Sequence, residues 1–244
     1  MSDRVFNLLI AGALLVVGGA CILAVWLIVH SPTPPAAAPA GCETFSQTSQ
    51  TVCGRFLAYW REHGGLTQQG YPLSGELQEV SPINGQTYTT QYFERAVFEY
   101  HPENQPPYDV LLALVGTIRY RTHYRVPPVE LDALPAALQP GRGKQFPETR
   151  RTVDGLFLDY WAAHGGLPQF GYPIANPITE RSETDGHTYL VQYFERALFE
   201  LHPENQAPYN VLPALLGRFE YQRRYPGAAT PRPATPLPAP SAAP

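Results

Sequence analysis

The chain contains one segment of about 80 residues twice, and this repetition limits the folds open to it more than any other feature. Residue n of the first copy matches residue n + 101 of the second without a gap, from Phe45/Phe146 to Tyr124/Tyr225. About 44 of the 80 paired positions are identical, far more than chance allows for an internal repeat. Because no insertion interrupts either copy, we expect the two to pack as one pseudo-symmetric body.

Each copy begins with a helical pattern. Apolar and aromatic residues recur at a 3.6-residue period, and a Gly-Gly pair then ends the predicted helix. The stripe consists of Val52, Phe56, Trp60 and His63 in the first copy and of Val153, Phe157, Trp161 and His164 in the second. Both histidines fall in the last helical turn, where the helix dipole favours positive charge. We therefore assign them a structural role rather than a metal-binding or catalytic one.

A turn and strand signals follow the helix. The turn is Gly70-Tyr71-Pro72 (Gly171-Tyr172-Pro173), and the hairpin signals are Asn84-Gly85 and Asp185-Gly186. A helical pattern returns over Tyr108–Tyr124. The sequence therefore predicts an α+β fold of two tandem pseudo-symmetric repeats, each with a short helix, a Gly-Gly/G-Y-P turn, a β-hairpin and a closing helix.

The best-preserved stretch is Gln91–Asn104, which returns almost unchanged as Gln192–Asn205. On a regular strand Arg95 and Glu99 share one face, and neither face is cleanly apolar. Two interpretations are open: both faces are partly buried, or a bulge resets the alternation. An internal ion pair between Arg95 and Glu99, repeated in the second copy, is expected.

The N-terminal region has the composition of a membrane anchor. Val5–Val29 is an apolar run broken only by Asn7. At 1.5 Å per residue it spans about 37 Å, enough for a transmembrane helix. A cleavable signal peptide usually has an apolar region of only about 7–15 residues, so a retained anchor is expected. Arg4 precedes the run and the next Lys or Arg is Arg55, which predicts a cytoplasmic N-terminus and external repeats.

Proline-rich segments flank the repeats, and such composition favours extended or disordered chain. A short helix is predicted over Val129–Leu138, between the copies. The predicted organisation is a cytoplasmic N-terminus (1–4), a transmembrane helix (5–29), a spacer (30–41), repeat 1 (42–125), a connector (126–144), repeat 2 (145–225) and a disordered tail (226–244).

The three cysteines differ in setting. Cys21 lies in the apolar run, where a small-residue helix face is a simpler explanation than lipid attachment. Cys42 and Cys53 lie in the part expected in an oxidising compartment, so a disulfide between them is predicted. The second copy has Gly143 and Asp154 at these positions, which restricts the bond to the first copy.

Charge and motifs exclude several functions. The net charge of −4 leaves no basic footprint for nucleic acid, and no cofactor or metal site is predicted. The chain has no nucleophile elbow, no His-Glu-x-x-His and no phosphate loop. A catalytic site normally breaks internal symmetry, whereas the chemically interesting residues here occur twice. A glycan hydrolase using Glu94 and Glu195 across the pseudo-twofold axis is therefore the less favoured alternative to a non-enzymatic module.

The order G-x-F-x-x-Y-W-x-x-H-G-G-L, G-Y-P and Q-Y-F-E-R-A-x-F-E resembles the LGFP repeat of bacterial surface and cell-wall proteins. The matching positions are Trp60/Trp161, Gly64-Gly65/Gly165-Gly166, Gly70-Tyr71-Pro72/Gly171-Tyr172-Pro173 and Phe93/Phe194. The chain departs from that family at the name-giving tetrapeptide, where Gln69 and Phe170 replace Leu and tyrosine replaces Phe. The resemblance covers about 60 residues of each copy, and it implies a module that docks envelope proteins or enzymes onto cell-wall polysaccharide.

The predicted function is a membrane-anchored, extracytoplasmic, non-catalytic binding module, with cell-envelope polysaccharide or an envelope protein as its partner. A protein-interaction or sensor ectodomain acting through a membrane partner is the alternative. Tyrosine offers a ring face for stacking on a sugar, and Arg and Glu offer directional polar contacts. The candidate ligand-binding residues are Tyr92, Glu94, Arg95, His101, Tyr193, Glu195, Arg196 and His202. For each of them the competing interpretation is that it holds the repeat together.

Overall fold

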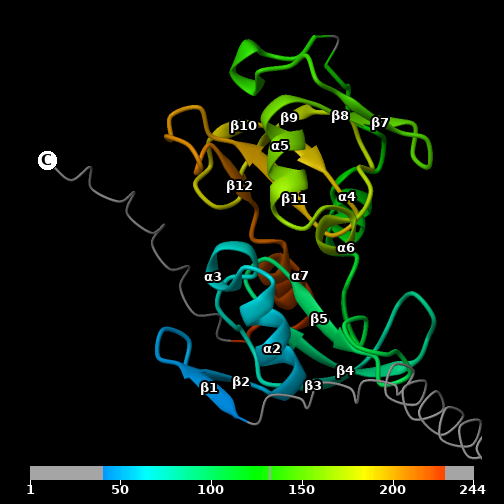
Figure 1. Ribbon diagram of the computed structural model, residues 1–244, viewed down its shortest axis with the longest axis vertical. Helices are drawn as coiled ribbons and strands as arrows, with labels where there is room; N and C mark the ends of the chain where they lie inside the picture. Colours follow the sequence, from blue (N-terminus) through cyan, green and yellow to red (C-terminus); the bar gives the residue numbers. More distant parts are fainter. Residues whose placement is uncertain (1–40, 132, 229–244) are drawn as a thin grey trace, which may run out of the picture. The chain divides into compact units, whose positions relative to one another are not determined.

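Each copy of the repeat builds a four-stranded antiparallel sheet with helices packed against it, as the predicted α+β class requires (Figure 1). The computed structural model describes residues 41–131 and 133–228, which belong to one compact unit. The predicted N-terminus (1–4), the transmembrane segment (5–29), nearly all of the spacer and most of the tail lie outside the described residues. Among the helices that are described, none combines the length and the apolar character needed to cross a bilayer.

The two copies have the same order of elements. The first consists of β1 (Cys42–Phe45), β2 (Gln50–Cys53), α2 (Gly54–Glu62), α3 (Gly65–Gln68), β3 (Leu77–Val80), β4 (Thr87–Tyr92), β5 (Val97–Tyr100), β6 (Val110–Leu112) and α4 (Val115–His123). The second consists of β7 (Lys144–Phe146), β8 (Arg151–Val153), α5 (Gly155–Ala163), α6 (Gly166–Phe170), β9 (Ile178–Arg181), β10 (Thr188–Tyr193), β11 (Leu198–Leu201), β12 (Val211–Pro213) and α7 (Leu216–Arg224).

Each copy opens with a two-stranded hairpin, β1–β2 or β7–β8, that the helical pattern concealed. Val52 and Val153, which the sequence placed on the helical stripe, lie at or beside the end of a strand and are fully buried. The helices begin after them, at Gly54 and Gly155. Apolar spacing alone does not locate the first residue of a helix, because a buried strand end adjoining it fits the same pattern.

The predicted disulfide between Cys42 and Cys53 is confirmed, and it joins residues that face each other across the β1–β2 hairpin. The second copy closes its hairpin with the Asp154 carboxylate instead. Asp154 Oδ1 accepts hydrogen bonds from the backbone N–H of Gly141 and of Arg142, both at 3.0 Å. The equivalent residues Cys53 and Asp154 thus close the hairpin by a disulfide in the first copy and by hydrogen bonds in the second.

Replacing both Cys42 and Cys53 by serine is expected to lower the free energy of unfolding by about 3 kcal/mol. The bond closes a loop between residues 11 positions apart, and cross-linking a loop of this length removes about that much chain entropy from the unfolded state. Urea denaturation of the oxidised protein and of the double-serine variant measures the difference. Asp154→Ala, the matched change in the second copy, should cost only about 1 kcal/mol. Equal costs for the two changes would contradict this account.

The sheets are simple meanders, β3-β4-β5-β6 and β9-β10-β11-β12. The predicted hairpins at Asn84-Gly85 and Asp185-Gly186 are present, and Ser81 N donates to Gln86 O at 2.8 Å to close the first of them. Gly85 has a φ of +74°, a value that glycine adopts without strain.

The Tyr88–Tyr100 stretch is a strand pair joined by a tight turn. Phe93 N donates to Ala96 O at 2.8 Å, so the alternation is reset by a turn rather than by a bulge. The predicted ion pair between Arg95 and Glu99 is therefore wrong. The Arg95 guanidinium donates to the backbone oxygens of Leu66 and Pro213, both at 3.2 Å. Its counterpart in the second copy likewise donates to backbone oxygens.

Two predicted helices are shorter than expected. The closing helix of the first copy begins only at Val115, because Val110–Leu112 form the edge strand β6. In the connector, the helix predicted over 129–138 is reduced to a 3-10 turn, Ala136–Leu138, whose Leu138 is fully buried in the core of the second copy.

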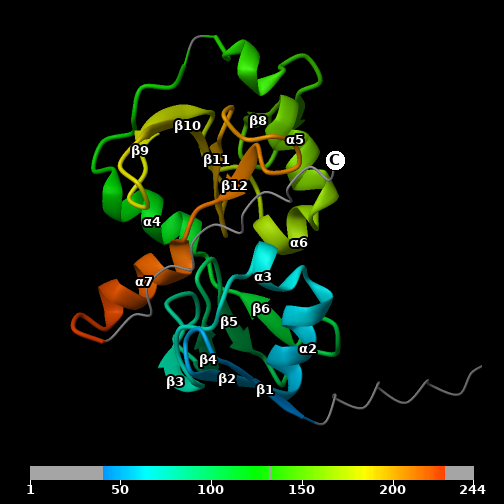
Figure 2. The ribbon, with the colours of Figure 1, turned by 90° about the vertical axis from the view of Figure 1, so that its left-hand side faces the viewer.

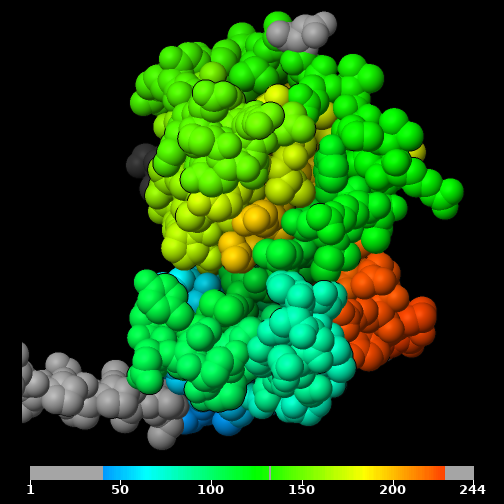
Figure 3. Space-filling model, turned by 90° about the vertical axis from the view of Figure 1, so that its right-hand side faces the viewer, coloured from blue at the N-terminus to red at the C-terminus, as the bar shows by residue number. Residues whose placement is uncertain are grey.

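The two copies exchange their closing helices, which lie next to each other (Figure 2). Helix α4 of the first copy packs on β10 of the second, and α7 of the second packs on β4 of the first. In the space-filling view, the orange-red α7 lies against the blue-green β3–β4 hairpin, and Arg224 of α7 pairs with Glu79 of β3 at 2.6 Å (Figure 3).

The exchange requires glycine in both helices. A Cβ on Gly116 would lie 2.0 Å from the backbone oxygen of Phe194, and one on Gly217 would lie 2.1 Å from that of Phe93. Next to them, Thr117 N donates to Glu195 O and Arg218 N donates to Glu94 O, each at 3.0 Å. Each helix thus docks on the β4–β5 turn, or its β10–β11 equivalent, in the other copy.

Three groups of buried apolar residues form the core. One belongs to the first copy, one to the second, and the third is shared, with Leu73, Tyr92, Val97 and Val115 from the first copy packed with residues of the second such as Tyr193. The shared core and the exchanged helices agree with the expectation of one pseudo-symmetric body.

Candidate functional site

The two candidate tyrosines of the strand face the shared core. Tyr92 and Tyr193 are about 1% and 0% exposed, and each ring contacts two tyrosines of the exchanged helix. Tyr92 Oη donates to the Glu79 carboxylate at 2.9 Å, and Tyr193 Oη donates to that of Glu180 at 2.8 Å. Burial first, and then the neighbouring carboxylate, raise the pKa of both phenols. These rings therefore pack inside the protein and present no face to a sugar.

The carboxylates of Glu79 and Glu180 each gather groups from both copies. Glu79 accepts from Tyr225 Oη at 2.5 Å, in addition to its bonds with Tyr92 and its ion pair with Arg224. Burial and the bond to Glu79 raise the pKa of Tyr225 to about 12. Glu180 accepts from Tyr124 Oη and lies 3.5 Å from Arg119. These contacts hold the exchanged helices in place.

The two candidate glutamates have different surroundings. Glu94 is 5% exposed, accepts from Tyr71 N at 3.1 Å and pairs with Arg218 at 2.9 Å. Glu195 accepts from Tyr172 N at 3.1 Å, but the residue equivalent to Arg218 is Thr117. Its side chain is accordingly 30% exposed, against 6% for Glu94.

The candidate arginines and histidines also make internal contacts. Arg95 and Arg196 hold backbone oxygens of both copies, as described above. His101 and His202 are each 7% exposed and pack against a tyrosine ring in a tilted arrangement. His202 Nδ1 lies 2.8 Å from Glu204 Oε1, and its Nε2 lies 3.5 Å from Glu200 Oε2. Burial lowers the pKa of His202, but the two glutamates raise it by more, so its pKa lies above the usual value.

We expect His202 to titrate above about pH 6.5 in an NMR pH titration of its ring protons. Because its folded-state pKa is raised, its charged form stabilises the fold fully below the unfolded pKa, and this contribution is lost as the pH rises through the folded pKa. The pKa of Glu204 is lowered, so its contribution is lost instead in acid. The penalty of His202→Gln should therefore shrink as the pH rises above about 6.5 and through the raised folded-state pKa. A His202 pKa below 6.5 would contradict the prediction.

Sequence reasoning missed an exposed tyrosine in the loop that follows each of these histidines. Tyr108 is 64% exposed and Tyr209 is 36% exposed, at matching positions of the two copies. The loop is fixed in the same way in both: the side chain of Asn104 donates to Tyr108 O at 3.0 Å, and that of Asn205 to Tyr209 O at 3.1 Å. A tyrosine kept in both copies outside any apolar stripe was the signal that could have revealed it.

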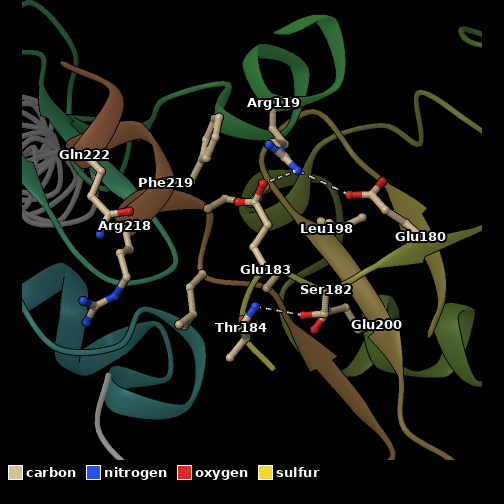
Figure 4. A pocket seen from close by; sticks show the side chains of 13 residues that line it. Arg119, Glu180, Ser182, Glu183, Thr184, Leu198, Glu200, Arg218, Phe219 and Gln222 are labelled. Carbon is tan, nitrogen blue, oxygen red and sulfur yellow. Dashed lines mark hydrogen bonds and ion pairs between the residues drawn. The ribbon is translucent and has the colours of Figure 1, made fainter. Parts of the chain in front are cut away.

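Two cavities lie at matching positions beside the exchanged helices. The larger, of about 410 Å³, lies between the second copy's sheet, α7 and Arg119 of α4 (Figure 4). Its counterpart in the first copy has about 140 Å³. Among the residues that the structure describes, no three His, Cys, Asp or Glu side chains are grouped so that they could hold a metal ion.

Comparisons of the chain with models of known families, with curated proteins and with solved structures found no match. The resemblance to LGFP repeats therefore stays a prediction.

Proposed function

We propose that residues 42–225 form a non-catalytic module that binds cell-envelope polysaccharide, held at the membrane by segment 5–29. The observation that carries the proposal is the pair of exposed tyrosines, Tyr108 and Tyr209, on loops that the two copies fix by the same hydrogen bonds. An exposed tyrosine ring stacks on the apolar face of a sugar, and its hydroxyl makes a directional bond. These tyrosines replace the buried Tyr92 and Tyr193 as the ligand contacts.

Two equivalent contacts suit a repeating polymer. When one loop holds a chain of sugar units, the second loop meets the same chain at a high effective concentration. Two weak contacts together then give a higher overall affinity than either contact alone. Fixed loops also spend little conformational entropy on binding.

The absence of a catalytic role in this proposal is supported by the surroundings of the duplicated carboxylates. Glu94 is ion-paired with Arg218, whereas Glu195 has a threonine at the corresponding position of its partner helix. Glu94 is also only 5% exposed and accepts a hydrogen bond from Tyr71 N, so its carboxylate is engaged inside the protein and is not available for acid/base work on a glycan.

The test is a titration of the full-length protein in detergent with purified cell-envelope polysaccharide. We expect submillimolar binding, about tenfold weaker in Tyr108→Ala and in Tyr209→Ala, and about 100-fold weaker in the double variant. Ile83→Ala is the matched control, because Ile83 is similarly exposed, at 62%, but lies in a different loop. Wild-type binding no better than about 1 mM would remove the proposed function, and unchanged binding by the double variant would remove the tyrosines from it.

A further inference from the structure

The cavity beside α7 is lined by both apolar and acidic side chains (Figure 4). Leu198, Leu215 and Phe219 are apolar, and Glu180, Glu183 and Glu200 are acidic. Ser182, Thr184 and Gln222 add hydroxyl and amide groups. A volume of about 410 Å³ lies in the range of small-ligand pockets, roughly 300–1,000 Å³, whereas the 140 Å³ counterpart falls below it.

The positive groups of the cavity are already engaged with carboxylates. Arg119 lies 2.9 Å from Glu183 and 3.5 Å from Glu180, and its guanidinium stacks over Phe219 at 4.5 Å (Figure 4). Arg218 pairs with Glu94 at 2.9 Å.

Glu200 is the carboxylate of this cavity that still has hydrogen-bond acceptor positions for a ligand. Its side chain is 9% exposed, and its cationic neighbour among the described residues is His202 Nε2, at 3.5 Å. This distance is too long for a strong charge-assisted hydrogen bond, and a carboxylate has about four acceptor positions. A buried carboxylate with a single long contact is costly unless a further donor reaches it. An ammonium group in the cavity would be such a donor.

The larger volume and the polar lining of this cavity are specific to the second copy. Glu183 and Thr184 stand where the first copy has Pro82 and Ile83, and the exchanged helix supplies Phe219 where the first copy has Ile118. Glu200, in contrast, has the equivalent Glu99, which lines the smaller cavity. The buried carboxylate is thus present in both copies, but in the second copy the cavity around it is larger and has more polar lining residues.

We propose that this cavity binds a single amino-sugar unit with a free, protonated amine. The ammonium group contacts Glu200, the sugar hydroxyls reach Ser182, Thr184 and Gln222, and the apolar ring face lies against the apolar side chains that include Phe219. The inference stands on the cavity alone and does not depend on the tyrosine loops, so free monosaccharides are suitable probes.

The experiment is calorimetric titration of the full-length protein in detergent with glucosamine, N-acetylglucosamine and glucose. We expect glucosamine to bind at least tenfold more tightly than the other two, because only glucosamine carries the positive charge. Equal affinities for the three sugars would overturn the proposal. Binding of lysine amide without binding of glucosamine would also overturn it, since the site would then recognise an amine on a peptide.

Two variants test the position of the ligand. Glu200→Gln removes the charge with almost no change of shape, and should weaken glucosamine binding at least tenfold. Ala214→Leu extends a side chain that lines the cavity and should block binding while keeping Glu200 in place. Glu99→Gln, the matched change in the smaller cavity, should leave binding unchanged. Thermal unfolding establishes that each variant is folded. Wild-type affinity in folded Glu200→Gln or Ala214→Leu would overturn the proposal, as would an equal loss in Glu99→Gln.

Discussion

Replacing Gly217 by alanine is expected to lower the free energy of unfolding by about 3 kcal/mol, and Gly116→Ala should do the same. Alanine normally stabilises a helix interior by up to about 1 kcal/mol relative to glycine, so the expected effect has the opposite sign to the helix propensity. The reason is the approach of backbone to backbone: the new Cβ would lie 2.1 Å from Phe93 O and 2.6 Å from Ala96 O. A backbone oxygen in a hydrogen-bonded turn cannot rotate away, so the whole helix must shift.

Urea denaturation of the two single variants and of the double variant provides the measurement. Gly75→Ala is the control, because a Cβ there meets nothing within 4 Å. It should change stability by no more than about 0.5 kcal/mol. A stabilising effect of Gly116→Ala or Gly217→Ala would show that the exchanged helices do not dock as closely as described.

Cutting the connector is expected to leave the two copies associated. Each copy relies on a helix that the other copy supplies, and the shared core holds buried side chains from both. Val126 is 77% exposed and Val129 is 91% exposed, and they precede Glu130, which pairs with Arg151. A specific protease sequence replacing residues 126–128 would therefore be accessible without disturbing these contacts.

Size-exclusion chromatography before and after cleavage measures the outcome. The cleaved protein should elute as one species at the volume of the uncut chain, and should separate into two fragments only in denaturant. A control with the site but without protease shows whether the replacement itself alters the fold. Separation into two folded fragments under native conditions would contradict the helix exchange.

Local chemistry made much of the fold predictable from sequence. The gapless repeat indicated a pseudo-symmetric body, and the Asn-Gly and Asp-Gly signals located the first hairpin of each sheet. The disulfide followed from the oxidising compartment expected for Cys42 and Cys53. Errors arose where a local pattern had two interpretations. Val52 fits a helical stripe and also the end of a buried strand, and Val110–Leu112 fit a helix as well as they fit the edge strand.

The candidate ligand residues were harder to place, because their surroundings come from the other copy. The sequence around Tyr92 is compatible with an exposed strand. Helix α7, more than 120 residues further along the chain, nevertheless covers this residue. The same long-range contact gives Glu94 its partner Arg218. Nothing in the sequence near Tyr92 or Glu94 reports that contact, so exposure could not be predicted there. The acidic cavity was hidden for the same reason, since Arg119 reaches it from the first copy.

The exchange of closing helices has a consequence for descent. An ancestral protein with a single copy of the segment would have had an uncovered sheet face and an unpacked closing helix, unless it formed a homodimer. Duplication within one gene would then have converted an exchange of helices between two subunits into an exchange within one polypeptide. After such a fusion the two copies could diverge in sequence, as at Cys53 and Asp154, but loss of either copy would leave the other without its closing helix.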